Sequence, residues 1–220
     1  MTEQITQWSF SRLKDYRQCP AKAKFKHILR LKEPGNAAMQ RGTDAHALAE
    51  SFARASLKAK APVELAKLEK EFRKLQKEGI ITEEKWALTK DWVPTGFFDK
   101  NCWVRVVLDC AFIDDATETL HIIDYKTGKV YEDSKEQLSL YAVAGFEHYP
   151  DVKHVSAELW YLDTGEIIKL EYDKSQLPAI KKEWKLKTRA MLNDKTFAPR
   201  AGSYCRWCHY RKTNGGPCEF

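Results

Sequence analysis

Two apolar runs in the middle of the chain constrain its fold more than any other feature. They cover residues 103–113 and 119–128, and in both runs apolar side chains occupy the two alternating faces of a strand. Strands that are apolar on both faces belong to a sheet that is covered on both sides. Similar runs follow at residues 155–163 and 165–172, after a helical pattern at 134–147. The sequence therefore predicts a mixed sheet from about residue 92 to residue 170, crossed by one helix.

Helical patterns flank this sheet in the sequence. Near the N-terminus, Ser9 or Ser11 can cap a first short helix, and a break at Cys19-Pro20 separates it from a second. Further helices are expected at residues 42–57, from Pro62 to Gly79, and at 175–192. With 43% hydrophobic residues and seven Trp, the chain can fill one large core. We expect a single α/β domain over residues 1–220, with a mainly helical part (1–80), a sheet core (81–172), and a C-terminal helix with a cysteine-rich tail (173–220).

Charge and hydropathy restrict the class of protein. The 37 Lys and Arg against 31 Asp and Glu give a net charge of +6, which suits a phosphate-backbone partner but is also common in ordinary basic proteins. No segment approaches the ~20 apolar residues of a membrane span, and the N-terminal residues lack the apolar stretch of a signal peptide. A cytoplasmic protein without a membrane partner is expected. In that reducing compartment the six Cys are better candidates for metal ligands than for disulfides.

The strand at 119–128 places an acid and a base on one face. Asp124 and Lys126 are two residues apart, so their side chains project in the same direction. If the preceding turn is centred between Ala116 and Thr117, the hairpin brings Asp109 directly opposite Asp124. Opposed side chains have Cβ atoms about 4.5–5.5 Å apart, which is unfavourable for two carboxylates unless a cation lies between them.

A hard divalent ion, Mg²⁺ or Mn²⁺, would resolve this conflict and could assist attack on a phosphodiester. Lys126 could then stabilise the developing negative charge. An isolated Asp-x-Lys pattern more often forms a surface salt bridge than an active site. Here the apolar flanks of Asp124 and Asp109 argue against that alternative, because a buried carboxylate needs a partner.

Two further pairs lie four residues apart on expected helices. His46 and Glu50 share one helical face and could reach a metal ion or a water molecule beside it. A packing role for the His is the plainer alternative. Gln137 and Tyr141 share another face, where Gln137 could equally belong to a helix cap and Tyr141 to the core.

The C-terminal tail carries three cysteines that could bind one metal centre. Cys205 and Cys208 form a Cys-x-x-Cys turn, Cys218 follows after nine residues, and Cys19 could supply a fourth thiolate from the other end of the chain. Four thiolates suit a 4Fe-4S cluster or structural Zn²⁺. The alternative is four free thiols that bind no metal. The remaining cysteines lie in apolar strands and are expected in the core: Cys102 and Cys110.

These motifs, in this order, resemble the RecB-type nucleases of the PD-(D/E)XK superfamily, which include nuclease domains of bacterial recombination helicases and four-cysteine exonucleases of CRISPR adaptation. The resemblance covers nearly the whole chain. It rests on Ser9 to Pro20, Gly42-x-x-x-His46-x-x-x-Glu50, Asp109, Asp124 to Gly128, Gln137-x-x-x-Tyr141 and the C-terminal cysteines. The chain departs from many members in the longer spacing between Cys208 and Cys218.

The resemblance implies a restriction-endonuclease-like core with a central mixed sheet flanked by helices. It implies metal ligation by His46, Asp109, Asp124 and the Tyr125 carbonyl, catalysis by Lys126, and substrate-binding or site-ordering roles for Gln137 and Tyr141, with Glu50 as a further candidate. It favours a 4Fe-4S cluster over Zn²⁺ in the tail. The implied activity is metal-dependent DNA hydrolysis by an exonuclease acting on single strands or ends, alone or with a helicase, recombination or CRISPR partner. A non-catalytic nucleic-acid-binding or assembly protein that kept the fold is the alternative.

Tryptophan supplies one more expectation about DNA binding. Trp86 and Trp92 could serve as stacking platforms for single-stranded bases, although most of the seven Trp must lie in the core.

Overall fold

A five-stranded mixed sheet forms the centre of residues 35–181, one of two units in the computed structural model. We call residues 35–181 the sheet unit. Residues 1–34 and 182–220 form the other unit, which we call the terminal unit because it combines both ends of the chain. The structure describes residues 4–130 and 134–220.

The strands lie in the sheet in the order in which they occur in the sequence. Neighbouring strands are antiparallel except for β3 and β4, which are parallel and are joined through helix α5. The strands are β1 (Ile81–Leu88), β2 (Val104–Asp114), β3 (Thr119–Lys126), β4 (His154–Tyr161) and β5 (Glu166–Asp173).

The hairpin between β2 and β3 has the register expected from its sequence. Asp114 holds the turn by accepting hydrogen bonds from the Ala116 amide (3.0 Å) and the Thr117 hydroxyl (2.8 Å). The strand pairs run from Asp114 opposite Thr119 to Cys110 opposite Ile123. This register centres the turn between Ala116 and Thr117 and confirms the predicted pairing.

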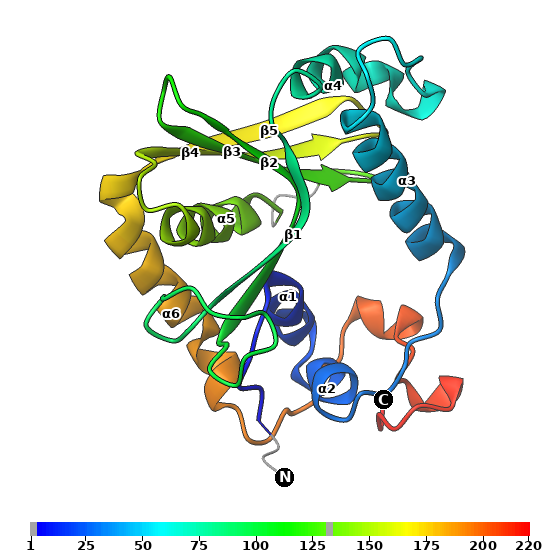
Figure 1. Ribbon diagram of the computed structural model, residues 1–220. Coiled ribbons are helices and arrows are strands. Elements are labelled where there is room, and N and C mark those ends of the chain that lie inside the picture. The colour runs from blue at the N-terminus through cyan, green and yellow to red at the C-terminus, as the bar shows by residue number, and fades with distance from the viewer. Residues whose placement is uncertain (1–3, 131–133) are drawn as a thin grey trace. The chain divides into compact units, whose positions relative to one another are not determined.

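Helices cover both faces of the sheet (Figure 1). On one face α5 packs so closely that a Cβ added to Gly145 would lie 2.7 Å from a side-chain carbon of Leu120. On the other face α3 and α4 share one hydrophobic core with β2, β3 and β4, which includes Phe72 and Tyr125. These helical elements are α3 (Ala37–Ala53), a 3-10 helix (Val63–Leu68), α4 (Glu69–Leu75), α5 (Ser134–His148) and a 3-10 turn (Lys174–Gln176).

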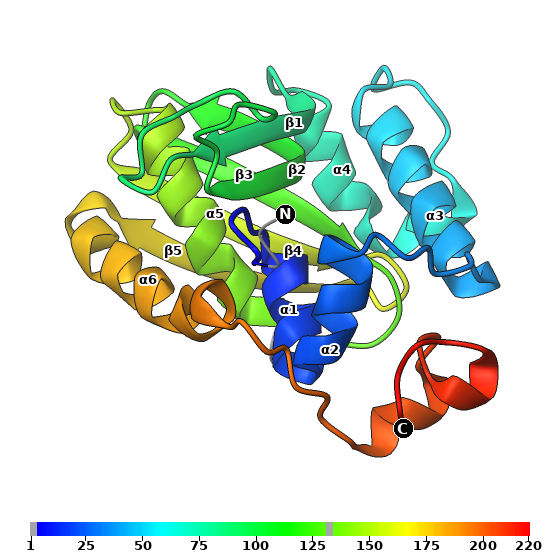
Figure 2. The same cartoon turned by 90° about the horizontal axis from the view of Figure 1, so that it is seen from below.

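The terminal unit is built from helices and a tail of short turns, with α1 and α2 side by side (Figure 2). Trp8 stacks on Trp184 with ring centroids 5.6 Å apart, and the Tyr16 hydroxyl donates to Asp194 at 2.8 Å. Both contacts join the two ends of the chain. The elements are α1 (Phe10–Gln18), α2 (Pro20–Ala23), a π-helical turn (Lys24–Ile28), the part of α6 (Leu177–Asn193) from residue 182 onward, and 3-10 turns at Ser203–Trp207 and Lys212–Asn214.

The predicted α/β architecture, a mixed sheet flanked by helices with a helical N-terminal region, is confirmed. Three details differ from the prediction. Strand β1 was not singled out by its sequence pattern, α3 begins at Ala37 because the Asn36 side chain caps it (Met39 amide, 2.9 Å), and the helix after Pro62 starts as a 3-10 helix. Within the described residues, no helix is long and apolar enough to cross a membrane. Residues 1–3, which belong to the N-terminal segment considered above, lie outside the described part.

Candidate active site

Two carboxylates meet where the β2–β3 ladder ends. The last paired residues are Cys110 and Ile123, so Asp109 and Asp124 occupy the next position on the two strands. Beyond the ladder, Asp109 Oδ2 accepts a hydrogen bond from the Tyr125 amide at 2.6 Å. The backbone of β3 thereby fixes the Asp109 carboxylate beside Asp124.

A ring of side-chain contacts holds Asp124 and Lys126. Lys126 forms an ion pair with Asp124 Oδ2 and donates to Gln137 Oε1 at 3.2 Å. Gln137 Nε2 donates to the Tyr141 hydroxyl at 2.5 Å, and that hydroxyl donates to Asp124 Oδ1. Helix α5 therefore presents Gln137 and Tyr141 to the acid and the base of β3, and fixes both.

His46 approaches the pair from α3. Its Nδ1 lies 3.2 Å from Asp109 Oδ1, and this hydrogen bond raises the pKa of His46, although partial burial acts in the opposite direction. The structure therefore brings together four elements that were predicted to meet: α3, β2, β3 and α5.

Electrostatics at the site disfavour two ionised carboxylates. Burial raises the pKa of Asp124, which is 6% exposed; Lys126 counteracts this effect, and the charge of Asp109 reinforces it. Burial and the adjacent Asp124 raise the pKa of Tyr141 well above its usual value, so the phenol remains a hydrogen-bond donor. A cation close to Asp109 and Asp124 would relieve the repulsion between them.

The donor set suits a hard divalent ion. Asp124 Oδ2 is buried and forms an ion pair with the Lys126 ammonium. Carboxylate oxygens are the usual donors to Mg²⁺ and Mn²⁺. Within residues 4–130 and 134–220, no group of three His, Cys, Asp or Glu side chains is arranged to hold a metal ion. The candidate ligands instead bind one another: His46 contacts Asp109, and Asp124 pairs with Lys126.

Glu50 lies one turn beyond His46 on α3, but its carboxylate has other partners. It accepts a hydrogen bond from the Thr82 hydroxyl at 2.5 Å and forms an ion pair with Arg54 at 3.3 Å. These contacts connect α3 to β1. The structure does not bring the Glu50 carboxylate into contact with Asp109 or Asp124.

Asp163 supports the loop that follows the site, and the sequence did not predict this role. It follows β4 and accepts a hydrogen bond from the Gly128 amide at 2.5 Å, while its carboxylate pairs with Arg41 of α3 and its carbonyl accepts from Lys67 at 2.6 Å. The Arg41 contact and the Gly128 amide lower the pKa of Asp163. Asp163 thus ties the loop after Lys126 to the helix that carries His46. Parallel pairing of Lys126 with Tyr161 places these loops together, and the sequence alone does not reveal that pairing.

The four cysteines that the sequence offers as cluster ligands all lie in the terminal unit: Cys19, Cys205, Cys208 and Cys218. Backbone amides point at two of the sulfur atoms: the Arg200 amide lies 3.3 Å from Cys19 Sγ, and the Gly202 amide lies 3.3 Å from Cys205 Sγ. Burial raises the pKa of the Cys208 thiol, and the nearby Cys218 and Cys19 add to this effect. All six cysteines are free thiols, and the two outside this cluster are buried in the sheet unit, as predicted: Cys102 and Cys110.

The expectation for Trp86 and Trp92 is wrong. Their side chains are 3% and 2% exposed, with Trp86 stacked on His148 and Trp92 packed edge-on against Trp103. Neither ring can receive a nucleic-acid base.

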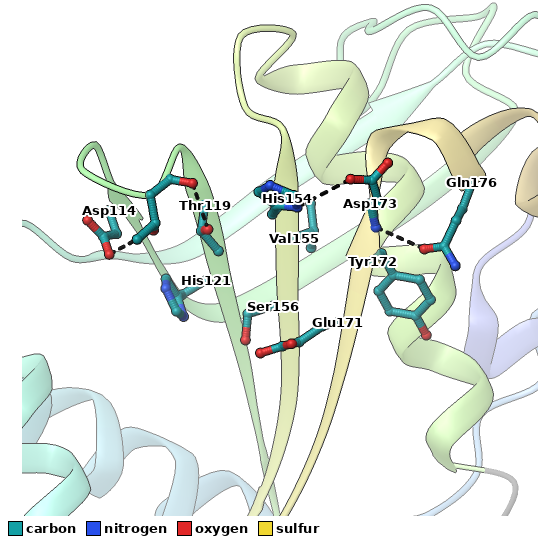
Figure 3. A pocket seen from close by; sticks show the side chains of 11 residues that line it. Asp114, Thr119, His121, His154, Val155, Ser156, Glu171, Tyr172, Asp173 and Gln176 are labelled. Carbon is teal, nitrogen blue, oxygen red and sulfur yellow. Dashed lines mark hydrogen bonds and ion pairs between the residues drawn. The ribbon is translucent and has the colours of Figure 1, made fainter.

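A hollow of about 580 Å³ lies at the other end of the sheet, around the start of β3 and β4 and the end of β5 (Figure 3). His121, His154, Glu171 and Asp173 line it, and His154 Nδ1 lies 3.5 Å from Asp173 Oδ2. None of the predicted site residues contributes to this hollow.

Comparisons with known proteins identify the family and a similar fold. The family model of the PD-(D/E)XK nuclease superfamily matches residues 7–213. A solved structure of a provisionally assigned exonuclease from Eubacterium rectale is similar in fold, with a TM-score of 0.52, 11% identity, and 95% and 88% of the two chains covered. The crystal structure of SSO0001 has a TM-score of 0.47 and 14% identity over 94% and 85% of the two chains. No curated protein matches the sequence.

Proposed function

The chain belongs to the PD-(D/E)XK nuclease superfamily, and on that basis we propose that it is an Mg²⁺- or Mn²⁺-dependent deoxyribonuclease that acts as an exonuclease on single-stranded DNA or DNA ends. The observation that carries this proposal is the meeting of Asp109 and Asp124 next to Lys126. A protein that only binds nucleic acid has no need for two carboxylates whose charges oppose each other beside a fixed lysine.

We assign the cation to His46, Asp109, Asp124 and the Tyr125 carbonyl. The ion would supply charge neutralisation at the phosphodiester and a water molecule of lowered pKa. Asp109 is preset for ligation because the Tyr125 amide holds Oδ2, which leaves Oδ1, beside His46, as the oxygen for the ion.

The other residues of the site stabilise negative charge or fix the positions of neighbouring side chains. Lys126 carries its positive charge next to Asp124 and would stabilise the negative charge that develops at the attacked phosphate. Gln137 and Tyr141 order the site by fixing Lys126 and Asp124 through hydrogen bonds. We assign Glu50 a supporting role, since its bond to Thr82 anchors the helix that presents His46.

We also propose a structural 4Fe-4S cluster held by Cys19 from the N-terminal helices and Cys205, Cys208 and Cys218 from the tail, with Zn²⁺ as the alternative. The amide hydrogen bonds to Cys19 and Cys205 support it, because N–H donors stabilise thiolate sulfur in such centres. Free thiols suit a reducing compartment, so we propose a cytoplasmic location. A helicase, recombination or CRISPR partner would supply the DNA ends on which the enzyme acts.

The substrate is tested with labelled single-stranded, double-stranded, end-blocked and circular DNA, each with Mg²⁺, Mn²⁺ or no added cation. We expect nucleotide release from free ends only when a divalent ion is added. Cleavage of circular DNA would contradict the exonuclease assignment. Absence of hydrolysis with every substrate and ion would contradict the nuclease assignment.

Lys126→Met separates catalysis from binding. We expect hydrolysis to fall at least about 100-fold, because the variant lacks the charge that stabilises the transition state, while Mg²⁺ binding measured by calorimetry is retained. The exposed Lys85→Met on β1 is the matched control and should keep wild-type turnover. Loss of Mg²⁺ binding in Lys126→Met would contradict the role given to this lysine.

A further inference from the structure

One tryptophan differs from all the others in its surroundings. Six of the seven Trp side chains are buried, whereas Trp207 is 78% exposed. Leaving so large an apolar ring in water is unfavourable, and tryptophan gains more than any other side chain when a flat partner covers it. The exposure of Trp207 therefore calls for a functional explanation.

Trp207 lies in a hydrogen-bonded turn. Trp207 ends the 3-10 helix that starts at Ser203, and the Cys208 amide closes this turn by donating to the Cys205 carbonyl at 3.0 Å. The Arg206 guanidinium lies 5.2 Å from the centre of the Trp207 ring. A cation in this position leaves the opposite face of the ring available for stacking.

The charge around Trp207 indicates the type of partner. Between residues 195 and 218 the chain has five basic residues and no Asp or Glu. Such a segment attracts a polyanion. The basic residues are Lys195, Arg200, Arg206, Arg211 and Lys212.

The other highly exposed aromatic ring, Phe98, gives a useful contrast. It is 82% exposed and also lies near a guanidinium, with Arg105 5.5 Å from its centre. Its loop, however, carries Asp91 and Asp99 as well as basic residues. The two rings are therefore similar in exposure and in cation contact, whereas their surrounding segments differ in charge.

We propose that Trp207 and Arg206 form a stacking platform for a base of single-stranded DNA, with the basic residues of the tail binding the adjoining phosphates. This inference deepens the proposed function and rests on it for the choice of DNA as the polyanion. An aromatic ring stacks on any base, so the platform would bind single strands without sequence preference, whereas paired bases in a duplex offer it no free face.

The test compares two oligonucleotides of equal length, an oligo-dT and an abasic strand with the same phosphates, in buffer without added divalent cation so that hydrolysis does not proceed. We expect Trp207→Ala to weaken oligo-dT binding about 5- to 150-fold, the equivalent of about 1–3 kcal/mol for one stacked base, and to leave abasic binding unchanged. Trp207→Phe should restore most of the affinity, and Phe98→Ala should bind like the wild type. In the wild type, oligo-dT should quench tryptophan fluorescence, because Trp207 is the accessible ring.

Several results would overturn the platform. One is unchanged oligo-dT binding in Trp207→Ala, and another is an equal loss for both oligonucleotides. Equal losses in Trp207→Ala and Phe98→Ala, or no binding of either strand to the wild type, would do the same. Because the readout is binding, the two proposals fail separately. A wild type that cleaves DNA although Trp207→Ala binds normally refutes only the platform, and base-dependent binding without any hydrolysis refutes only the nuclease.

Discussion

Asp124 is held where burial and a neighbouring carboxylate both oppose its ionisation. Because burial and Asp109 raise the pKa of Asp124 in the folded chain, the folded state binds its proton more tightly than the unfolded state does. The ionised form therefore lowers the free energy of unfolding at pH values above the raised pKa, and this cost disappears as the pH falls below the unfolded value. A fold retains such a residue for its function and not for its stability.

Asp124→Asn should accordingly abolish activity without harming the fold. We expect turnover with Mg²⁺ to fall at least about 100-fold because a charged ligand is lost, and the melting temperature at pH 7 to stay equal or rise. Steady-state kinetics and thermal melts measure the two effects. Asp115→Asn, in the exposed turn before β3, is the control and should leave turnover unchanged. Wild-type turnover in Asp124→Asn would exclude the proposed site.

Asp163 should act on the site through position. Asp163→Ala removes the acceptor for the Gly128 amide and the partner of Arg41, so we expect kcat to fall roughly 10-fold with KM for DNA changed little. Asp163→Asn keeps an acceptor for the amide and should recover most of kcat, which a purely electrostatic role would not allow. Equal losses of kcat in both variants would contradict the positioning role.

The sequence predicts those parts of the site that depend on local turn and helix geometry. Turn symmetry alone places Asp109 opposite Asp124, and helical spacing places Gln137 and Tyr141 on one face. The contacts of Glu50 and Asp163 depend on how α3 meets β1 and on the parallel pairing of β3 with β4, neither of which a local pattern contains.

At the level of elements, clear periodicity decided what could be predicted. The strands β2 to β5 and helix α5 have long apolar patterns and were expected. Strand β1 carries three charged residues in a row between Thr82 and Trp86, so it lacks the alternation that marks a strand. Its ladder with β2 also skips Glu83, which has a positive φ of 56°, directly across from Asp109. The least regular strand segment thus lies next to the site.

Helix α5 is positioned by a glycine, which gives a prediction at this scale. In Gly145→Ala the new Cβ would lie 2.7 Å from Leu120 and 3.2 Å from Ile122, so we expect a loss of about 1–3 kcal/mol in the free energy of unfolding despite better helix propensity. Because α5 carries Gln137 and Tyr141, kcat should fall as well. Urea denaturation measures the stability. Gly79→Ala, where nothing lies within 4 Å of the added Cβ, is the control, and equal stability of both variants would contradict the close packing of α5.

At the scale of the whole chain, the terminal unit joins segments that are far apart in sequence. The contacts of Trp8 with Trp184 and of Tyr16 with Asp194 hold its helices together. The tail is fixed by Tyr210, which packs on Phe25 and donates to the Leu31 carbonyl at 2.9 Å. Cysteine spacing indicated that the ends would meet, but the aromatic contacts could not be derived from it, because isolated aromatic residues carry no partner information.

The cysteine cluster should therefore stabilise the attachment of the tail in addition to the side-chain contacts that already hold it. A centre that links Cys19 to Cys218 closes a loop of nearly the whole chain. Closing this loop lowers the conformational entropy of the unfolded chain, which raises the free energy of unfolding by on the order of 5 kcal/mol. Metal binding adds to this stability. Because other contacts already join the two ends, the observed gain should be smaller than this figure.

We expect Cys208→Ala to lose the metal, to melt at a lower temperature and to lose activity in proportion to the unfolded fraction, since the cluster is proposed to supply no ligand to the carboxylate site. Wild type purified without oxygen should be brown, with broad absorbance near ~400 nm for an iron-sulfur centre, whereas zinc leaves it colourless. Metal analysis, absorbance and thermal melts measure these effects. Cys102→Ala, buried in the sheet unit, is the matched control and should keep the full metal content. A Cys19→Ala variant with unchanged metal content and melting temperature would show that Cys19 is not a ligand, and the two ends of the chain would then be joined by side-chain packing and hydrogen bonds without the cluster.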